Sequence, residues 1–310
     1  MEFVKLGWMS KVEDSSDALL DNYLPHLPVV RPEKSSSKVR IVFDASAKSR
    51  GELCLNDCVE VGDNLYPDML GIILRFGWHK IAWIGDVSKA FLQLELRPED
   101  RAACKVLWIE DVEHPMSSRV ITLQWNRVAF GIACSPFLLA ATIRKHLKKF
   151  EASHHELTEM IQKNTFVDDW TGGADSVDEA HGLIQRGISI FEDACMNIGR
   201  WETNSVELKQ RLANSEEKGE VSGTLTGTLL GCSKMLGLRW DTSGDFYFFD
   251  PSSLIRQVET CDVLTKRKLL QVASKLFDPV GFISPVVINV KVIFQDLGRG
   301  RGSGLGFGCA

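Results

Sequence analysis

The chain has 310 residues, 44% of them hydrophobic and 25% charged, a composition that predicts a packed core and excludes a wholly disordered protein. A formal net charge of −5 excludes a protein that is basic overall, so a nucleic-acid-binding surface would have to come from local clusters of Lys and Arg. Eight cysteines with no CxxC pair argue against a zinc site or a disulfide framework and indicate reduced thiols.

The first 33 residues are expected to be irregular and to end in a Pro-rich extended segment at 23–32. No signal peptide is predicted at this end, and the apolar stretch at 279–294 is too short and too interrupted to cross a membrane. Basic residues surround a short β-type run at 39–43, namely Lys34, Lys38, Arg40, Lys48 and Arg50. Charge alone leaves open whether they line a positive channel or an ordinary solvated face.

One helix and three strands are expected next. Pro67 and Asp68 begin the helix, because proline suits the first helical turn. Apolar runs predict strands at 81–84 and 120–123, and alternation of leucine with polar residues predicts another at 92–97.

In the second half, Ser135 is expected to cap a helix with Pro136 in its first turn. Residues 166–171 are predicted to form a β-hairpin with Asp168 and Asp169 at its tip. The remaining expected elements are an amphipathic helix at 176–198 with a capping box, a polar loop at 206–228, strands at 236–240 and 246–249, and a helix at 266–277. Such irregular interleaving of strands and helices is typical of α+β proteins.

Three carboxylates are the candidate metal ligands. Asp86 ends an apolar strand, and Asp168 and Asp169 stand side by side at the hairpin tip. Hard divalent ions prefer carboxylate oxygens, and two such ions astride a phosphate can promote in-line displacement. An Asp pair at a turn is also ordinary turn chemistry, so these residues alone do not identify an enzyme.

Three ordered motifs resemble those of retroviral and retrotransposon reverse transcriptases: DVSKAF at 86–91, FGIACSP at 130–136 and FVDD at 166–169. The BEL/Pao branch of LTR retrotransposons is the finer match. The segments similar to it are YLPHLPVV at 23–30, RIVFDASAK at 40–48, LND at 55–57 with GDNL at 62–65, LGLRW at 236–240 and FDPVGFISP at 277–285. The resemblance extends over about residues 1–297.

This resemblance implies an RNA-directed DNA polymerase of α+β class with a right-hand architecture: fingers, a palm with an antiparallel sheet, and a partial thumb or connection. The implied boundaries are an N-terminal lead segment at 1–22, fingers and palm at 23–205, a thumb/connection-like region at 206–297 and an aberrant Gly/Arg-rich tail at 298–310.

The resemblance also implies a role for each matching residue. Asp86, Asp168 and Asp169 would be catalytic and, with the Val87 carbonyl, would bind two Mg²⁺ ions, for which Mn²⁺ could substitute. The residues expected to bind the nucleotide are Lys38, Arg40, Phe91, Phe130, Gly131 and Arg200. Those expected to contact template or primer are Ser135, Pro136, Leu236 and Gly237.

The implied partners are an RNA or DNA template-primer and deoxynucleoside triphosphates, without a membrane, in a cytoplasmic retroelement particle. The RNase H, integrase and protease modules of such a polyprotein are expected to be missing. Phe166 departs from the family's tyrosine, and the Gly/Arg tail replaces its Trp-Arg segment. These departures leave open an inactive remnant that keeps the fold and binds nucleic acid. A metal-dependent phosphoesterase is disfavoured, because the nearest histidines, His154 and His155, stand in a polar segment.

Overall fold

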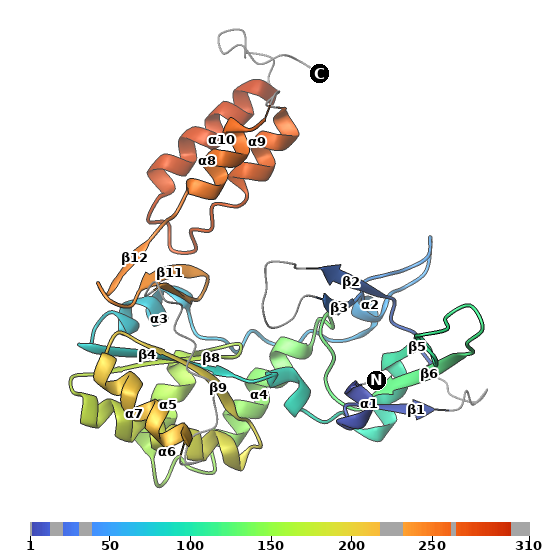
Figure 1. Ribbon diagram of the computed structural model, residues 1–310, viewed down its shortest axis with the longest axis horizontal. Helices are drawn as coiled ribbons and strands as arrows, with labels where there is room; N and C mark the ends of the chain where they lie inside the picture. Colours follow the sequence, from blue (N-terminus) through green and yellow to red (C-terminus); the bar gives the residue numbers. More distant parts are fainter. Residues whose placement is uncertain (1, 13–20, 31–38, 218–231, 262–264, 299–310) are drawn as a thin grey trace. The chain divides into compact units, whose positions relative to one another are not determined.

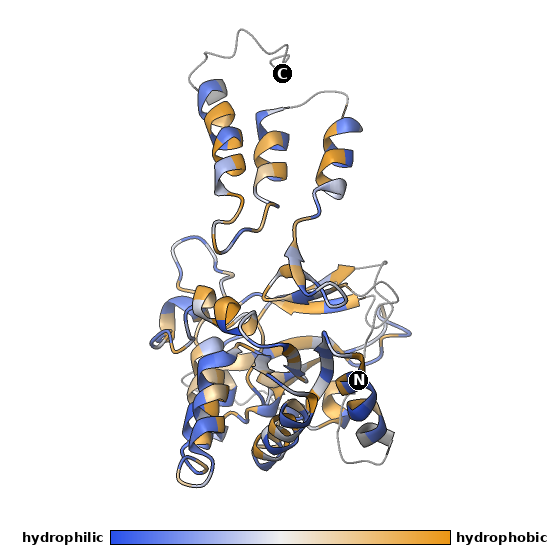
Figure 2. Cartoon of the chain, turned by 90° about the vertical axis from the view of Figure 1, so that its left-hand side faces the viewer, coloured by the Kyte–Doolittle hydropathy of each residue, from blue (hydrophilic) through white to orange (hydrophobic). Residues whose placement is uncertain are grey.

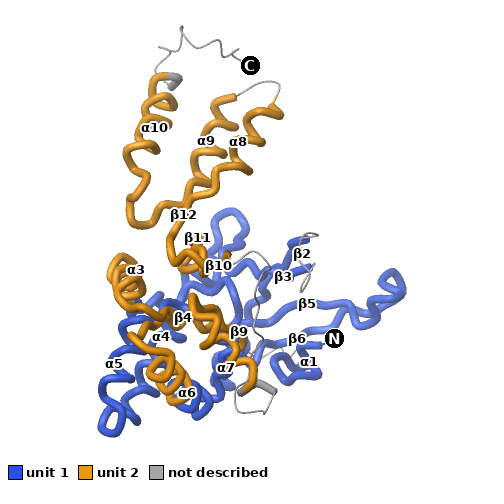
Figure 3. Tube along the Cα trace, turned by 60° about the vertical axis from the view of Figure 1, so that its left-hand side comes forward, with its two compact units in different colours: residues 1–66, 87–168, 187–198 blue, residues 67–86, 169–186, 199–310 orange. Residues whose placement is uncertain are grey.

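The computed structural model describes residues 2–12, 21–30, 39–217, 232–261 and 265–298 (Figure 1). The chain forms two compact units, each built from separate stretches of sequence (Figure 3). Unit 1 comprises Met1–Tyr66, Val87–Asp168 and Gly187–Ile198, and unit 2 comprises Pro67–Asp86, Asp169–Arg186 and Gly199–Ala310. Neither unit is therefore a continuous segment of chain.

Unit 1 contains two antiparallel sheets. In the three-stranded sheet, β6 (Val120–Trp125) lies between β1 (Met9–Val12) and β5 (Lys105–Ile109). The second is a ladder of β2 (His26–Val30) and β3 (Val39–Phe43). The prediction of β3 is confirmed. The expectation of an irregular first 33 residues is wrong, because β1 pairs with β6, far along the sequence, and β2 pairs with the next strand, β3.

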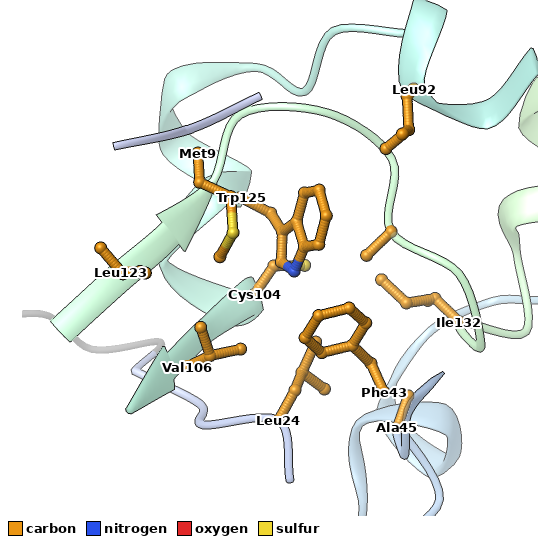
Figure 4. Close-up of a cluster of buried hydrophobic side chains, with 11 residues drawn as sticks. Met9, Leu24, Phe43, Ala45, Leu92, Cys104, Val106, Leu123, Trp125 and Ile132 are labelled. Atoms are coloured by element: carbon orange, nitrogen blue, oxygen red, sulfur yellow. The ribbon is translucent and has the colours of Figure 1, made fainter. Parts of the chain in front are cut away.

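Aromatic and aliphatic side chains form the core of unit 1 (Figure 4). Trp125 is fully buried and meets Phe43 edge-on, with 5.2 Å between the ring centroids. Val106 and Leu123 extend the cluster along β5 and β6, and Ile132 joins it from the loop before α4. Burying a side chain of this size stabilises a fold by about 1.5–3 kcal/mol, so the cluster holds sheet and loop together.

The helices of unit 1 are α1 (Glu2–Lys5), α2 (Leu55–Cys58), the 3₁₀ helices η1 (Ala90–Gln93) and η2 (Pro98–Cys104), α4 (Ser135–Leu147) and α5 (His155–Asn164). The strand expected at 92–97 is wrong. Lys89 adopts a left-handed conformation, φ 53°, and starts η1 instead. Alternating leucines resemble a strand pattern, but Glu95 makes only an isolated bridge with Arg127 among the described residues.

A four-stranded sheet has the order β7-β8-β4-β9, formed by β7 (Thr165–Phe166), β8 (Asp169–Ala174), β4 (Ile81–Val87) and β9 (Ile198–Thr203). Every residue of β4 except Asp86 is buried, as its apolar run predicts. Trp170 packs edge-on against both Trp83 and Trp201, at 6.1 and 5.9 Å between centroids. All three indole rings are fully buried, so β4, β8 and β9 share a rigid aromatic layer.

The other elements of unit 2 are α3 (Met69–Phe76), α7 (Val206–Glu217), β10 (Cys232–Met235), β11 (Leu238–Asp241), β12 (Phe246–Phe248), α8 (Ser252–Glu259), α9 (Lys266–Ala273) and α10 (Ser284–Gly298). Helix α6 (Val177–Asp193) passes from unit 2 into unit 1. The Asp68 carboxylate caps α3 by accepting the Gly71 N–H at 2.7 Å, which confirms the predicted helix start.

The polar loop expected at 206–228 is wrong in its first half, where α7 forms, and its second half lies outside the described residues. Helices α8 and α9 contain no buried residue, although both mix apolar and polar side chains (Figure 2). None of the described helices has the length and apolar character that a membrane crossing needs.

Candidate metal and nucleotide site

Three carboxylates meet at one end of the four-stranded sheet. Asp86 on β4 is the antiparallel partner of Asp169 on β8, and Asp168 immediately precedes Asp169. One carboxylate oxygen from each of the three lies within 4.8 Å of the others, and all three side chains are partly buried. Strand pairing thus brings together two sequence positions more than 80 residues apart, as the motif order predicts.

The hairpin tip that carries Asp168 is held in an unusual conformation. Val167 has φ 58°, a left-handed geometry that costs a β-branched residue about 1–3 kcal/mol. The Val87 N–H donates to the Asp168 carbonyl oxygen at 2.7 Å, and the Ser88 N–H donates to the Asn197 carbonyl oxygen at 2.8 Å. The first bond holds the tip against the end of β4 that carries Asp86, and the second ties the chain after β4 to the residue before β9.

The electrostatics of Asp168 favour a bound cation. Burial raises the pKa of Asp168, and the positive charge of Arg40 partly opposes this effect. A desolvated carboxylate beside two other carboxylates is unfavourable in its charged form unless a cation compensates for the lost hydration. Oxygen donors this close together, and the absence of soft ligands from the set, fit a divalent metal ion.

A second group of predicted residues meets in unit 1. The Arg40 guanidinium lies 5.3 Å from the centroid of the Phe130 ring, and Phe130 packs edge-on against Phe91 at 5.6 Å. Gly131 has φ 93°, and a Cβ there would lie 2.5 Å from the Phe43 carbonyl oxygen, so the position requires glycine. The close contact between Gly131, in the loop after β6, and Phe43, the last residue of β3, therefore helps to fix the stack of Arg40, Phe130 and Phe91.

Two residues that the sequence analysis assigned no role support these groups. The Asn56 side-chain oxygen accepts the Ala133 N–H at 2.8 Å, and its amide donates to the Gly131 carbonyl oxygen at 3.1 Å. The Tyr66 hydroxyl donates to the Pro136 carbonyl oxygen at 2.8 Å. Burial, with a smaller contribution from the Asp168 charge, raises the pKa of Tyr66 to about 12, so the phenol stays protonated.

Of the two predicted template residues at the start of α4, Pro136 is exposed and Ser135 is buried. Cys134, not Ser135, occupies the N-cap position, so the expected serine cap is wrong. The Ser135 side chain is buried, and its hydroxyl donates to the Ala129 carbonyl oxygen at 2.9 Å. Asn56, Tyr66 and Ser135 thus hold the segment from Gly131 to Pro136 at both ends.

The other predicted site residues belong to other elements of the sequence. Arg200 is exposed on β9, the neighbour of β4. Leu236 and Gly237 form the turn between β10 and β11, with φ 48° and 88°. Lys38 lies outside the described residues.

Solved structures that share the fold include foamy viral proteins. The structure of the foamy viral protease-reverse transcriptase dRH in complex with double-stranded DNA matches with a TM-score of 0.59 and 17% identity, over 94% of this chain and 42% of that one. Two further structures of the foamy viral protease-reverse transcriptase, with an RNA/DNA hybrid and with double-stranded DNA, match with TM-scores of 0.57 and 16% identity. They are covered over 32% and 49% of their lengths, again by 94% of this chain.

The chain shares its fold with these proteins. It spans less than half the length of each. At a sequence identity of 16–17%, the likeness shows the fold alone. The mixed helix and sheet architecture expected from the sequence is therefore confirmed, whereas its division into fingers, palm and thumb stays a prediction.

A family match falls at the other end of the chain. Residues 265–301 match the family described as Pao retrotransposon-like RNaseH-like domain. This segment contains α9 and α10, which the sequence analysis placed in a thumb/connection-like region. No curated protein matches the chain. The Pao match and the shared fold together support a retroelement pol protein.

Proposed function

We propose that the chain is the reverse transcriptase part of a BEL/Pao-type retrotransposon polyprotein, an RNA-directed DNA polymerase that adds deoxynucleotides to a primer 3′-OH. The observation that carries this proposal is the cluster of Asp86, Asp168 and Asp169, whose carboxylate oxygens lie within 4.8 Å of one another. The Pao match and the fold shared with foamy viral protease-reverse transcriptases support it.

In this proposal Asp86 and Asp168 hold two Mg²⁺ ions, with Asp169 in support and the Val87 carbonyl oxygen as a further ligand. Bound Mg²⁺ would supply the charge that lowers the pKa of the primer hydroxyl and stabilises the leaving pyrophosphate. The protein's own contribution is to hold the three carboxylates close together before substrate arrives. The hydrogen bond from Val87 to the Asp168 carbonyl oxygen supports that preorganisation.

The nucleotide would lie along the stack of Arg40, Phe130 and Phe91. A guanidinium forms paired hydrogen bonds with phosphate oxygens, so Arg40, together with Lys38, would bind the triphosphate. Phe91 would lie beneath the sugar and exclude a 2′-hydroxyl, since its half-buried ring is fixed edge-on against Phe130. Phe91→Val should then admit ribonucleotides, as a primer-extension assay with each nucleotide type would measure.

Primer extension tests the proposal directly. The purified chain should extend oligo(dT) on poly(rA) with Mg²⁺ or Mn²⁺ and should stop when EDTA removes the metal. Asp168→Asn should abolish extension, because it removes a ligand charge without changing the size of the side chain. Asp175→Asn is the matched control, since it makes the same substitution at an exposed residue that directly follows β8. The ion pair of Asp175 with His79, at 3.1 Å, is exposed and therefore weak.

The outcome also decides between the polymerase and an inactive remnant. The foamy viral structures contain double-stranded DNA or an RNA/DNA hybrid, and we propose such a template-primer, with deoxynucleoside triphosphates, as the partner of this chain. A chain that binds a labelled RNA/DNA hybrid but extends no primer would support the remnant. Extension by Asp168→Asn at the wild-type rate would contradict the metal-site assignment.

A further inference from the structure

Unit 1 contains an apolar pocket, most of whose lining has no part in the proposed polymerase reaction. Its volume is about 400 Å³, and its walls come from α1, β3, β5 and β6. Val4 and Trp108 in the lining are only half-buried, and the buried residues of the lining are Met9, Phe43, Val106, Leu123 and Trp125. A pocket of this volume with aromatic and aliphatic walls is typical of sites for small organic ligands.

The charges at this pocket are few. Within the lining, Glu2 and Arg40 are the charged side chains, and both are exposed. No ion pair in the described part of the chain involves Arg40, whose guanidinium instead lies over the Phe130 ring. A guanidinium over an aromatic ring is weakly hydrated and well suited to a carboxylate or sulfonate. The Glu2 carboxylate would disfavour a second negative charge on the same ligand.

We propose that this pocket binds an amphipathic monoanion, a small molecule with an apolar body and one carboxylate or sulfonate group, whose anion contacts Arg40. A nucleobase fits less well, because bases are recognised through hydrogen bonds to their edges. The lining that the structure describes includes no Asn, Gln, Ser or Thr side chain to make such bonds.

The pocket shares Arg40 and Phe130 with the proposed nucleotide site. A ligand that engages the Arg40 guanidinium would therefore compete with the triphosphate of an incoming nucleotide. This consequence rests on the proposed function, whereas binding of the anion to unit 1 does not. The pocket would make unit 1 a site at which an apolar acid inhibits the polymerase.

Two fluorescent probes of similar shape test the proposal on the full chain. The anionic probe is 1-anilinonaphthalene-8-sulfonate, and the neutral one is N-phenyl-1-naphthylamine, which lacks the sulfonate. Binding is measured by titration of probe fluorescence in EDTA and without nucleotide, so that failure of the polymerase proposal leaves the result readable. Arg40→Ala should weaken the anionic probe about tenfold and change the neutral probe by less than about twofold, while the exposed Arg50→Ala should change neither.

Filling the pocket provides the second arm. Val4→Phe should weaken both probes about tenfold or more, because the larger ring occupies the space between α1 and the core. Val286→Phe, at a 64% exposed position on α10, is the matched control for probe that adheres to other apolar surfaces. Ile41→Phe fills the same pocket from β3. It replaces Val4→Phe in the experiment if the circular dichroism spectrum shows that Val4→Phe does not fold.

Competition between the anionic probe and two acids identifies the apolar part of the ligand. Displacement of the anionic probe by 2-naphthoate supports an aromatic acid, and displacement by decanoate supports an acyl chain. Displacement by neither, or equal binding in Val4→Phe, Ile41→Phe and Val286→Phe, overturns the pocket. Equal weakening of both probes by Arg40→Ala overturns the role of the charge. If binding is confirmed, loss of anionic probe on addition of a deoxynucleoside triphosphate tests the competition separately.

Discussion

Gly131→Ala is the sharpest test of how the loop before α4 is held. Gly131 has φ 93°, and an added Cβ would lie 2.5 Å from the Phe43 carbonyl oxygen. That oxygen would have to retreat by about 0.9 Å to reach ordinary contact at 3.4 Å. The left-handed backbone alone costs an alanine about 1–2 kcal/mol, and overpacking against a fixed backbone adds about 1–3 kcal/mol.

Gly51→Ala separates these two contributions. Gly51 has φ 88°, nearly the same backbone conformation, but its added Cβ would have no neighbour within 4 Å. We expect the free energy of unfolding to fall by about 1–2 kcal/mol in Gly51→Ala and, with overpacking added, by about 2–5 kcal/mol in Gly131→Ala. Urea denaturation followed by tryptophan fluorescence measures both, since Trp125 packs directly on Phe43. Equal losses in the two variants would refute the argument that β3 fixes this loop.

Two further predictions concern Tyr66 and Asp168. Tyr66→Phe keeps the ring beside Phe166 but removes the hydroxyl that donates to the Pro136 carbonyl oxygen, so the free energy of unfolding should fall by about 1 kcal/mol. An unchanged urea midpoint would show that this bond contributes nothing. Burial raises the pKa of Asp168 above its ordinary 3.8, so the folded state is favoured when this carboxyl is protonated and loses stability as the pH rises through the raised pKa. In EDTA, Asp168→Asn should therefore be more stable than the wild type at pH 7, and the difference should shrink as the pH falls toward 3.8; a difference independent of pH would contradict the burial argument.

Local patterns predicted the elements that carry the three carboxylates. The apolar run before Asp86 and the paired acids after Phe166 indicated β4 and the hairpin because burial and turn chemistry act on neighbouring residues there. Strand β1 was missed because its four residues acquire their conformation from Trp125 and its neighbours on β6. Helix α7 was missed because its sequence is mostly polar, although Leu208 and Leu212 are fully buried.

The contrast between local patterns and contacts with distant segments also explains which site residues could be predicted. The carboxylates, Arg40, Phe91 and Phe130 belong to short motifs whose residue order is itself the signal. Asn56 and Tyr66 act through hydrogen bonds to residues more than 65 positions away, which no periodicity within a short segment reveals. The sequence does place a tyrosine directly before a proline, in Asn64-Leu65-Tyr66-Pro67. This pattern does not indicate which residue the Tyr66 hydroxyl would bond.

The pairing of β1 with β6 has a consequence for how the chain is made. The hydrogen bond between Ser10 and Asn126 spans 116 residues, and among the described strands β1 pairs with β6 alone, which is synthesised much later. At a translation rate of about 5–20 residues per second, this interval lasts roughly 6 to 23 s. Throughout it, Met9 and the chain segments that later cover it stay open to water, so a chaperone that holds apolar nascent chains should increase the yield of folded unit 1.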